Sequence, residues 1–321
     1  MYWAAACGGC EMSLLNTGET LLAVAERFDI VFCPCLVDAK RADLERLPDG
    51  SVDLALFNGA IRTGENEEMA RLIRRKARTL VAYGSCAHEG CVPGLSNLGT
   101  RAGHFAAMYT DNPSTVNPAG VVPGVETVVP EGATLRLPAF FERVATLADV
   151  VEVDYTIPGC PPESPRVAEA LAALTGDAPP PRGAVVGAGT LAVCAECPRT
   201  RTHPPLERLV RVHEIVPDEG TCLLDQGLVC MGPATRDGCG ARCPRVAMPC
   251  TGCYGAAAGI GDQGAGMVSA IGALLPVGGA AGTDAAELAA GIDRILDAVP
   301  DLAGTFYLYS LAASTLGKRR P

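Results

Sequence analysis

The distribution of cysteine is the feature that most constrains what this chain can fold into. Fifteen cysteines occur among its 321 residues, and eight of them fall between residues 194 and 253. Regular hydrophobic periodicity is nearly absent from that stretch, so an ordinary core is difficult to form there. In a reducing compartment, many thiols indicate metal or redox chemistry more often than a disulfide framework. We therefore expect metal ligation to hold this segment together.

Charge and hydropathy exclude several functional classes. The chain has 26 basic and 36 acidic residues, for a net charge of −10, and no Lys or Arg stripe that could neutralise phosphates, so no nucleic-acid partner is expected. The tract 266–279 is too short and too rich in glycine to span a membrane, so membrane insertion is not expected. The first residues, MYWAAACGGC, resemble no export signal, and we expect a cytoplasmic protein.

The first 176 residues alternate short apolar runs with amphipathic stretches, a pattern typical of an α/β fold with a doubly wound parallel sheet. The pattern predicts helices at 13–26, 66–78 and 164–174, the clearest being Glu67–Arg78 with its apolar face. Strands are predicted at Tyr2–Ala6, Ile30–Cys33, Val52–Phe57, Thr79–Tyr83 and Val151–Thr156.

Four cysteines follow predicted strands. Cys7 and Cys10 come after the first strand, Cys86 after the fourth in YGSC, and Cys160 after the fifth in IPGC. Ligands of open α/β sheets bind outside the carboxyl ends of the strands, and the neighbouring glycines would let the backbone approach a bulky group. We expect these four thiols to converge on one edge of the sheet.

A Pro- and Gly-rich linker at 177–189 divides the chain into a domain at 1–176 and a loop-rich second domain at 190–321. A helix at Asp284–Ala298 could pack over the metal centres. The eight cysteines of the second domain form two plausible sets of four. One set is Cys194, Cys197, Cys222 and Cys230; the other is Cys239, Cys243, Cys250 and Cys253.

Four thiolates suit either zinc or an iron-sulfur cluster. Irregular gaps and a Cys-Pro step favour iron-sulfur, as does the strand-end position of the first four cysteines. Cys33, Cys35 and Cys91 are left over, and we interpret them as buried, inert thiols. Glu11 follows Cys10 and could carry protons beside the first centre, or its carboxylate could cap the following helix.

Several stretches together resemble the small subunits of nickel-iron hydrogenases, over nearly the whole chain. They are CGGCE at 7–11, VAYGSCAHEGCVPGL at 81–95, DYTIPGCPPE at 154–163, CPRTRTHPPLERLVRVHEI at 197–215 and GPATRDGCGARCPRVAMPCTGCYG at 232–255. The resemblance is closest to the cytoplasmic, methyl-viologen-reducing, deazaflavin-nonreducing type associated with heterodisulfide reductase.

The resemblance implies a flavodoxin-like first domain and three 4Fe-4S clusters that relay electrons. By their order, Cys7, Cys10, Cys86 and Cys160 would hold the proximal cluster, Cys239, Cys243, Cys250 and Cys253 the medial one, and Cys194, Cys197, Cys222 and Cys230 the distal one. Many respiratory small subunits have His at the position of Cys194. This chain has a cysteine there, so all the ligands of its clusters would be cysteines. The nickel-iron centre would lie on a partner large subunit. An iron-sulfur or flavin protein, such as a heterodisulfide-reductase-type protein, would accept the electrons. We expect it to bind at an exposed, cationic segment around Arg199 and Arg201.

Two other hypotheses remain at this point. The chain could be the cluster-bearing subunit of a complex I-type or membrane-bound hydrogenase assembly, but such subunits carry adjacent cysteines and lack the second domain. No adjacent cysteine pair occurs here. It could also be a zinc-stabilised interaction module, which would be colourless where an iron-sulfur protein is brown.

Overall fold

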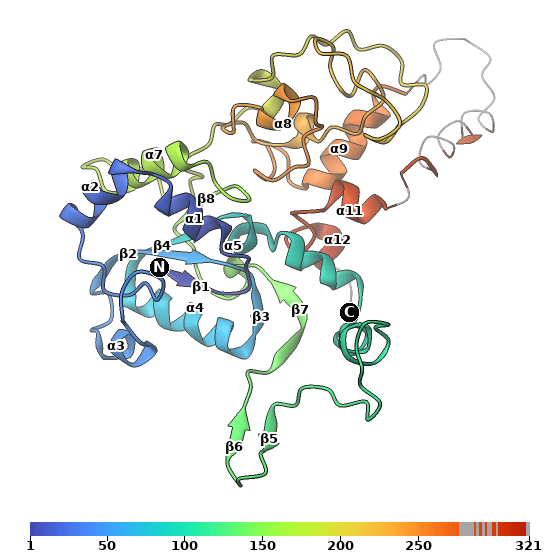
Figure 1. Cartoon of the computed structure of the whole chain (residues 1–321). Coiled ribbons are helices and arrows are strands. Elements are labelled where there is room, and N and C mark those ends of the chain that lie inside the picture. The colour runs from blue at the N-terminus through green and yellow to red at the C-terminus, as the bar shows by residue number, and fades with distance from the viewer. Residues whose placement is uncertain (276–285, 287–288, 291–292, 294–296, 300, 319–321) are drawn as a thin grey trace.

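The computed structural model describes residues 1–275, 286, 289, 290, 293, 297–299 and 301–318. Four strands form its main sheet in the order β1-β2-β4-β8 (Figure 1). They are β1 (Tyr2–Trp3), β2 (Val52–Asn58), β4 (Ala77–Tyr83) and β8 (Tyr155–Ile157). All neighbouring pairs run parallel, so the carboxyl ends of the four strands meet at one edge. The predicted α/β class with a parallel sheet is confirmed.

Helices cover both faces of this sheet. Successive residues of a strand point to opposite faces, and here Phe57 and Leu80 are buried in a core with helix α4 (Gly64–Lys76). Their neighbours Leu56 and Val81 are buried in a second core with helix α7 (Ser164–Leu174). The doubly wound arrangement predicted from the sequence therefore follows from this alternation.

Local chemistry sets the bounds of α4. The Thr63 hydroxyl oxygen accepts a hydrogen bond from the Asn66 N–H at 3.3 Å, and the Asn66 side chain accepts one from the Thr63 N–H at 3.2 Å. This reciprocal pair is a capping box. The predicted apolar face of α4 is buried. The helix ends at Lys76, before the predicted end at Arg78, because β4 begins at Ala77.

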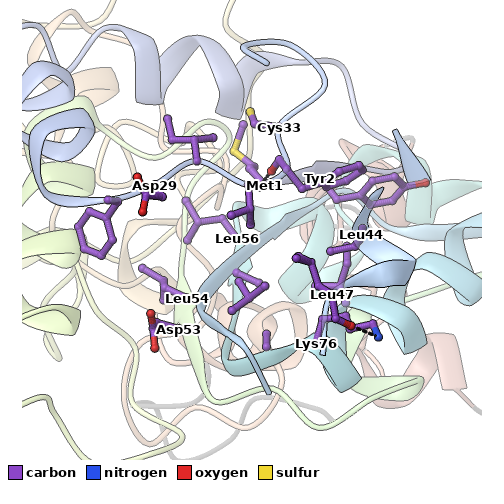
Figure 2. Close-up of a pocket in the computed structure, with 18 of the residues that line it drawn as sticks. Met1, Tyr2, Asp29, Cys33, Leu44, Leu47, Asp53, Leu54, Leu56 and Lys76 are labelled. Carbon is purple, nitrogen blue, oxygen red and sulfur yellow. Dashed lines mark hydrogen bonds between the residues drawn. The ribbon is translucent and has the colours of Figure 1, made fainter. Parts of the chain in front are cut away.

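The strand predicted at Ile30–Cys33 does not form: in the described chain these residues are irregular and join no ladder. They line a largely apolar cavity of about 500 Å³ together with Leu54 and Leu56 of β2 (Figure 2). The same cavity is lined by the first residues of β2 and β4. It therefore lies towards the amino ends of the strands, away from the edge where the cysteines were predicted.

Two further boundaries differ from prediction. The strand expected from Val151 begins only at Tyr155, because the Asp154 carboxylate accepts a hydrogen bond from the Leu80 N–H at 2.8 Å and an ion pair from Arg74 at 2.7 Å. A side chain thus takes the place of a strand carbonyl. The helix expected at 13–26 is two helices, α1 (Gly9–Leu15) and α2 (Glu19–Arg27). Gly18, with φ of 63°, separates them.

A small antiparallel sheet and a hairpin, neither predicted, lie beside the parallel sheet. Strand β3 pairs with β7, and β5 pairs with β6 in a hairpin that projects from the body of the protein (Figure 1). The remaining elements of this part are α3 (Arg41–Arg46), β3 (Ile61–Thr63), α5 (Ser85–Glu89), η1 (Val92–Leu98), α6 (Arg101–Phe105), η2 (Ala106–Thr110), β5 (Glu126–Val128), β6 (Thr134–Arg136), β7 (Phe140–Ala145) and η3 (Leu147–Asp149).

The cysteine-rich part is built from loops and short helices, as predicted. Its elements are η4 (Val193–Ala195), η5 (Gly232–Ala234), α8 (Arg242–Arg245), α9 (Gln263–Gly272), α11 (Leu302–Phe306) and α12 (Thr315–Lys318). It nevertheless has an apolar core, in which Leu223, Leu228 and Met267 are fully buried. Most of the helix predicted at Asp284–Ala298 lies outside the described residues. In the described part of the chain, no helix has the length and hydrophobicity needed to cross a membrane.

The predicted linker packs against the sheet. The Thr156 N–H donates to the Ala184 carbonyl at 3.2 Å, and the Val186 N–H donates to the Thr156 carbonyl at 2.8 Å. Val186 is buried in the core that includes α7. The division into domains at 1–176 and 190–321 stays a prediction.

Candidate metal centres

Cys7, Cys10, Cys86 and Cys160, here called the proximal group, come together at the carboxyl edge of the sheet. Cys10 is on α1 and Cys86 on α5, which follow β1 and β4, and Cys160 follows β8. Burial raises the pKa of the Cys10 thiol, and the nearby charges of Cys160 and Cys7 raise it further. The spatial convergence predicted for these residues is therefore present.

Glycines make room for these thiols. Gly84, between β4 and α5, has φ of +83°, and a Cβ atom there would collide with the sulfur of Cys10. A Cβ atom on Gly9 would come within 3.4 Å of the Cys7 sulfur. The backbone therefore approaches the sulfur atoms more closely than any side chain would allow. This space suits a bulky inorganic group held by the proximal group.

A fifth thiol lies at this site, which the sequence reasoning missed. Cys91 is 1% exposed, and its sulfur lies 3.5 Å from the sulfur of Cys160. Its burial agrees with the packing role expected for it, but its contact with a candidate ligand does not follow from packing alone. The sequence feature that could have indicated this contact is the short spacing of five residues between Cys86 and Cys91. The other leftover thiols, Cys33 and Cys35, lie 3.3 Å apart. Cys33 is buried as predicted, but Cys35 is exposed, so the prediction that it is a buried thiol is wrong.

Glu11 is buried next to the proximal group. Its Oε1 atom accepts a hydrogen bond from the Asn58 side chain at 2.7 Å, and its Oε2 atom has no partner. No side chain caps α1 by a hydrogen bond, although Glu11 lies in its first turn. Glu11 therefore does not cap α1 through a hydrogen bond, and it could favour the helix only through a negative charge near the first turn.

Cys194, Cys197, Cys222 and Cys230, the distal group, line one cavity of about 320 Å³. Burial, together with the charge of neighbouring Cys230, raises the pKa of Cys194 to about 11. Gly232 borders the same space: a Cβ atom there would lie 3.2 Å from the Cys194 sulfur and 3.6 Å from the Cys230 sulfur. The four thiols therefore surround a space large enough for an inorganic cluster.

Two arginines beside the distal group have different roles. Arg199 is buried, and its guanidinium donates hydrogen bonds to the carbonyls of Pro244, Asp218 and Thr221. The expectation that it forms part of an exposed cationic surface is wrong, because these bonds tie together the loops around the cavity. Arg201 is exposed and lines the same cavity.

Cys239, Cys243, Cys250 and Cys253 form the medial group. Burial raises the pKa of Cys253 to about 12, and Cys239, Cys160 and Cys243 add to the shift. Glu196 fixes the loop around Cys239, because its Oε1 atom accepts hydrogen bonds from the N–H groups of Gly238 and Ala241, both at 3.1 Å. Cys253 therefore lies close to two members of its own group and to one of the proximal group.

Hydrogen bonds connect the three groups in a row. The Cys250 N–H donates to the Cys230 sulfur at 3.3 Å, which joins the medial and distal groups. The Ser85 hydroxyl donates to the Cys253 carbonyl at 2.6 Å and accepts from the Gly159 N–H at 3.3 Å. Ser85 adjoins Cys86, and Gly159 adjoins Cys160, so this serine joins the medial and proximal groups. The order is proximal, medial, distal.

Each group offers four thiols, a donor set that can hold a metal ion or an iron-sulfur cluster. A zinc ion would need its sulfur ligands about 2.3 Å from one centre, whereas a cubane spreads its four ligands over separate iron atoms. The grouping of these cysteines, with glycines beside them, fits 4Fe-4S clusters.

Glu89 is the last residue of α5, and its side chain lies against the loop that follows Cys253. It is buried, and burial raises its pKa to about 8, although the Ala256 N–H and Arg236 partly oppose this shift. A Cβ atom on Gly255 would meet its Oε1 atom at 2.8 Å. Glu89 therefore holds the medial loop against the helix that carries Cys86.

We expect the stability of the chain to depend on the protonation of Glu89. Burial lowers the pKa of neighbouring His88 to about 4, so the His88 contribution to stability rises with pH up to about 6.5. Glu89 acts in the opposite direction: the folded protein keeps a proton on Glu89 that the unfolded chain has lost, so its contribution to stability falls from about pH 5 to about pH 8 and is level above that. Glu89→Gln should remove this decrease, which urea unfolding at several pH values would measure. Glu68→Gln, at an exposed carboxylate, is the control. Identical pH profiles for wild type and Glu89→Gln would contradict the assignment.

Comparison with known proteins identifies the family. Over 320 residues the chain is 38% identical to the iron-sulfur subunit of the F420-non-reducing hydrogenase of Archaeoglobus profundus, covering 98% of this chain and 95% of the relative. The chain belongs to the nickel-iron hydrogenase small subunits. Identity to a subunit of the F420-non-reducing hydrogenase of Methanothermobacter marburgensis is 36% over 319 residues, covering 98% of this chain and 94% of the relative. The predicted family and its F420-non-reducing type are confirmed.

The family described as NADH ubiquinone oxidoreductase, 20 Kd subunit, matches residues 7–174 of this small subunit. That match ends before the eight cysteines of the medial and distal groups. Among solved structures, an NAD+-reducing [NiFe]-hydrogenase in the H2-reduced state is 34% identical, covers 53% of this chain and 85% of that chain, and has a TM-score of 0.45. As a member of the family shown by its relatives, the small subunit is part of a hydrogenase, pairs with a nickel-iron large subunit and lacks the nickel site itself.

Proposed function

We propose that this small subunit holds three 4Fe-4S clusters, one on each cysteine group, and so relays electrons for the hydrogenase. The observation that carries the proposal is the row of groups joined through Cys230 and Cys250 and through Ser85 and Cys253. When bound, the clusters would supply one-electron carriers. The chain's own contribution is to fix their order, to exclude water and to leave one end of the row near the surface.

The proximal end of the row is the proposed docking face for the large subunit. It lies at the carboxyl edge of the sheet, where open α/β folds bind their ligands, and Cys7 there is exposed. Trp3 and Met12, which flank the proximal group, are also exposed, at 50% and 55%. Apolar side chains of this size on a surface are typical of protein interfaces.

The distal end is the proposed exit to an acceptor. Exposed Arg201 and His203 line the cavity of the distal group, and Arg201 is a cation on a chain whose net charge is −10. A local cationic patch would favour an acidic partner surface and guide its approach. An iron-sulfur or flavin protein of the heterodisulfide-reductase type is the proposed acceptor, in the cytoplasm, where all fifteen free cysteines stay reduced.

Glu11 has a proposed role in proton transfer near the proximal group. Its buried Oε2 atom and the buried Oδ1 atom of Asn58 both lack partners, although the two residues share one hydrogen bond. Such unpartnered atoms are suited to a transient proton or water contact. Glu11→Gln would preserve the hydrogen bond to Asn58 and remove the carboxylate that could take up and release a proton.

Iron and acid-labile sulfide analysis tests the cluster proposal. We expect about twelve iron atoms and about twelve sulfides per chain, because three groups of four cysteines each suit one cubane, and a brown absorbance. A Cys250→Ala variant, which removes one medial ligand, should lose about four iron atoms. Zinc without absorbance, or wild-type iron near eight, would refute the assignment.

A second candidate is the cluster-bearing subunit of a complex I-type or membrane-bound hydrogenase assembly. The family match over residues 7–174 favours it. The proximal group alone would be needed in such a subunit, whereas this chain builds two more groups beyond residue 190. Purifying the native complex and identifying its subunits separates the two proposals.

A further inference from the structure

The thiol of Cys91 is held against a candidate ligand of the proximal group. Its sulfur donates towards the Cys160 sulfur at 3.5 Å, and Cys86 also lies near it. The residue is 1% exposed, so no water competes for these contacts. Four of the five sulfurs at this edge fill the ligand positions of one cubane, and Cys91 is the one left over.

The backbone aims Cys91 at this position. Its φ is 48° and its ψ is −151°, a backbone conformation that residues with a side chain rarely adopt. The Gly94 N–H donates to the Gly90 and Cys91 carbonyls at 3.0 and 2.9 Å. Cβ atoms on Gly90 or Gly94 would meet Ala312 at 2.5 or 3.2 Å. The turn is therefore locked between α5 and the end of the chain.

Chemistry fixes the direction of the hydrogen bond. A cysteine that ligates iron is a thiolate and can only accept hydrogen bonds, so Cys160 would accept when a cluster is bound. Cys91 has no iron to ligate in a four-cysteine cubane and keeps its S–H proton. A donor beside the ligand sulfurs stabilises the more negative, reduced form of a cluster and raises its reduction potential.

We propose that Cys91 is a thiol donor to the Cys160 sulfur that raises the reduction potential of the proximal cluster. The inference rests on the proposed function, since it needs a cluster on the proximal group. Cys91 is a positioning and tuning residue here, because it acts through the ligands. The proximal cluster would be the first acceptor of electrons from the large subunit. Cys91 would give this cluster a higher reduction potential than its four ligands alone.

The test compares Cys91→Ala and Cys91→Ser in the purified complex of large and small subunits, by redox titration of the proximal cluster's electron paramagnetic resonance signal. Cys91→Ala should lower the midpoint potential, and Cys91→Ser, which keeps a donor of similar size, should leave it at or above the wild-type value. Iron content should stay unchanged in both. Cys33→Ala, at a buried thiol near the other end of the sheet, is the matched control and should change nothing.

Equal potentials in wild type, Cys91→Ala and Cys91→Ser would overturn the proposal and leave Cys91 a packing residue. Loss of iron in Cys91→Ser would also overturn it, because Cys91 would then be a ligand. A wild-type complex without any proximal signal would instead refute the proposed function. If Cys91→Ala fails to assemble, Cys91→Val, which fills the space without offering a donor, takes its place and should show the same lowered potential.

Discussion

Replacing Gly84 with alanine should prevent the proximal group from holding a cluster. The added Cβ atom would collide with the sulfur of Cys10, which is buried on α1, so the thiol would be pushed away from its place in the proximal group. We expect the purified variant to lose about four iron atoms, and the complex to lose hydrogen-dependent dye reduction. Iron analysis and the activity assay measure the two effects.

Gly183→Ala is the matched control for this prediction. Gly183 has φ of +84°, nearly the same as +83° at Gly84, but nothing lies within 4 Å of the position of its added Cβ atom. The two variants are matched in φ, but Gly84 also has ψ of 162°, in a region of backbone conformation that is essentially restricted to glycine. A lower iron content in Gly84→Ala than in Gly183→Ala therefore reports the combined effect of this backbone conformation and of the contact with Cys10. Equal iron content in the two variants would show that the proximal site has more room than the structure gives it.

The sequence predicted most of what positions the proximal group. Parallel strands with alternating burial place their carboxyl ends at one edge whatever the lengths of their loops, so Cys7, Cys10, Cys86 and Cys160 could be brought together by pattern alone. Helix α7 has the predicted bounds, Ser164–Leu174, because Glu163 and Pro165 mark its start. These features depend on local patterns that a sequence displays directly.

What could not be predicted depends on side-chain direction. Asp154 delays the start of β8 to Tyr155 by accepting a hydrogen bond from the Leu80 N–H. Nothing in the sequence VVEVDYTI shows that this carboxylate is buried and not exposed. Cys91 reaches Cys160 only because its backbone adopts a positive φ, which is rare for a residue with a side chain. Arg199 was expected at the surface and is buried, because three carbonyls from different loops surround it.

The cysteine-rich part shows a related limit. Its core draws Leu223, Leu228 and Met267 from loops and one helix, so no period of 2 or 3.6 residues reveals it in the sequence. The expectation that metal alone would organise this part therefore understates its packing. Apolar burial and the proposed clusters would both contribute to its stability, and the loss of one cluster need not unfold the whole part.

Replacing Cys194 with histidine should keep a distal cluster but raise its reduction potential. Cys194 lines a cavity of about 320 Å³ with the other members of its group, which offers space for an imidazole. A neutral nitrogen would replace one thiolate charge, and such replacement raises the potential of iron-sulfur centres. Each upward shift of about 59 mV makes onward transfer to a low-potential acceptor about tenfold less favourable.

The distal group lies at the end of the row remote from the proposed docking face, so this change should separate two activities of the complex. Hydrogen oxidation coupled to a low-potential acceptor should slow by roughly tenfold or more, following the same relation. Hydrogen–deuterium exchange at the large subunit should persist, because it needs no electron exit. Arg211→Ala, at an exposed residue outside the distal cavity, serves as a control in which both activities stay unchanged. If exchange is lost together with acceptor reduction in a Cys194→His complex that still contains nickel and about twelve irons, the distal group does not stand at the exit, and the order of the three groups would have to be reversed or rebuilt.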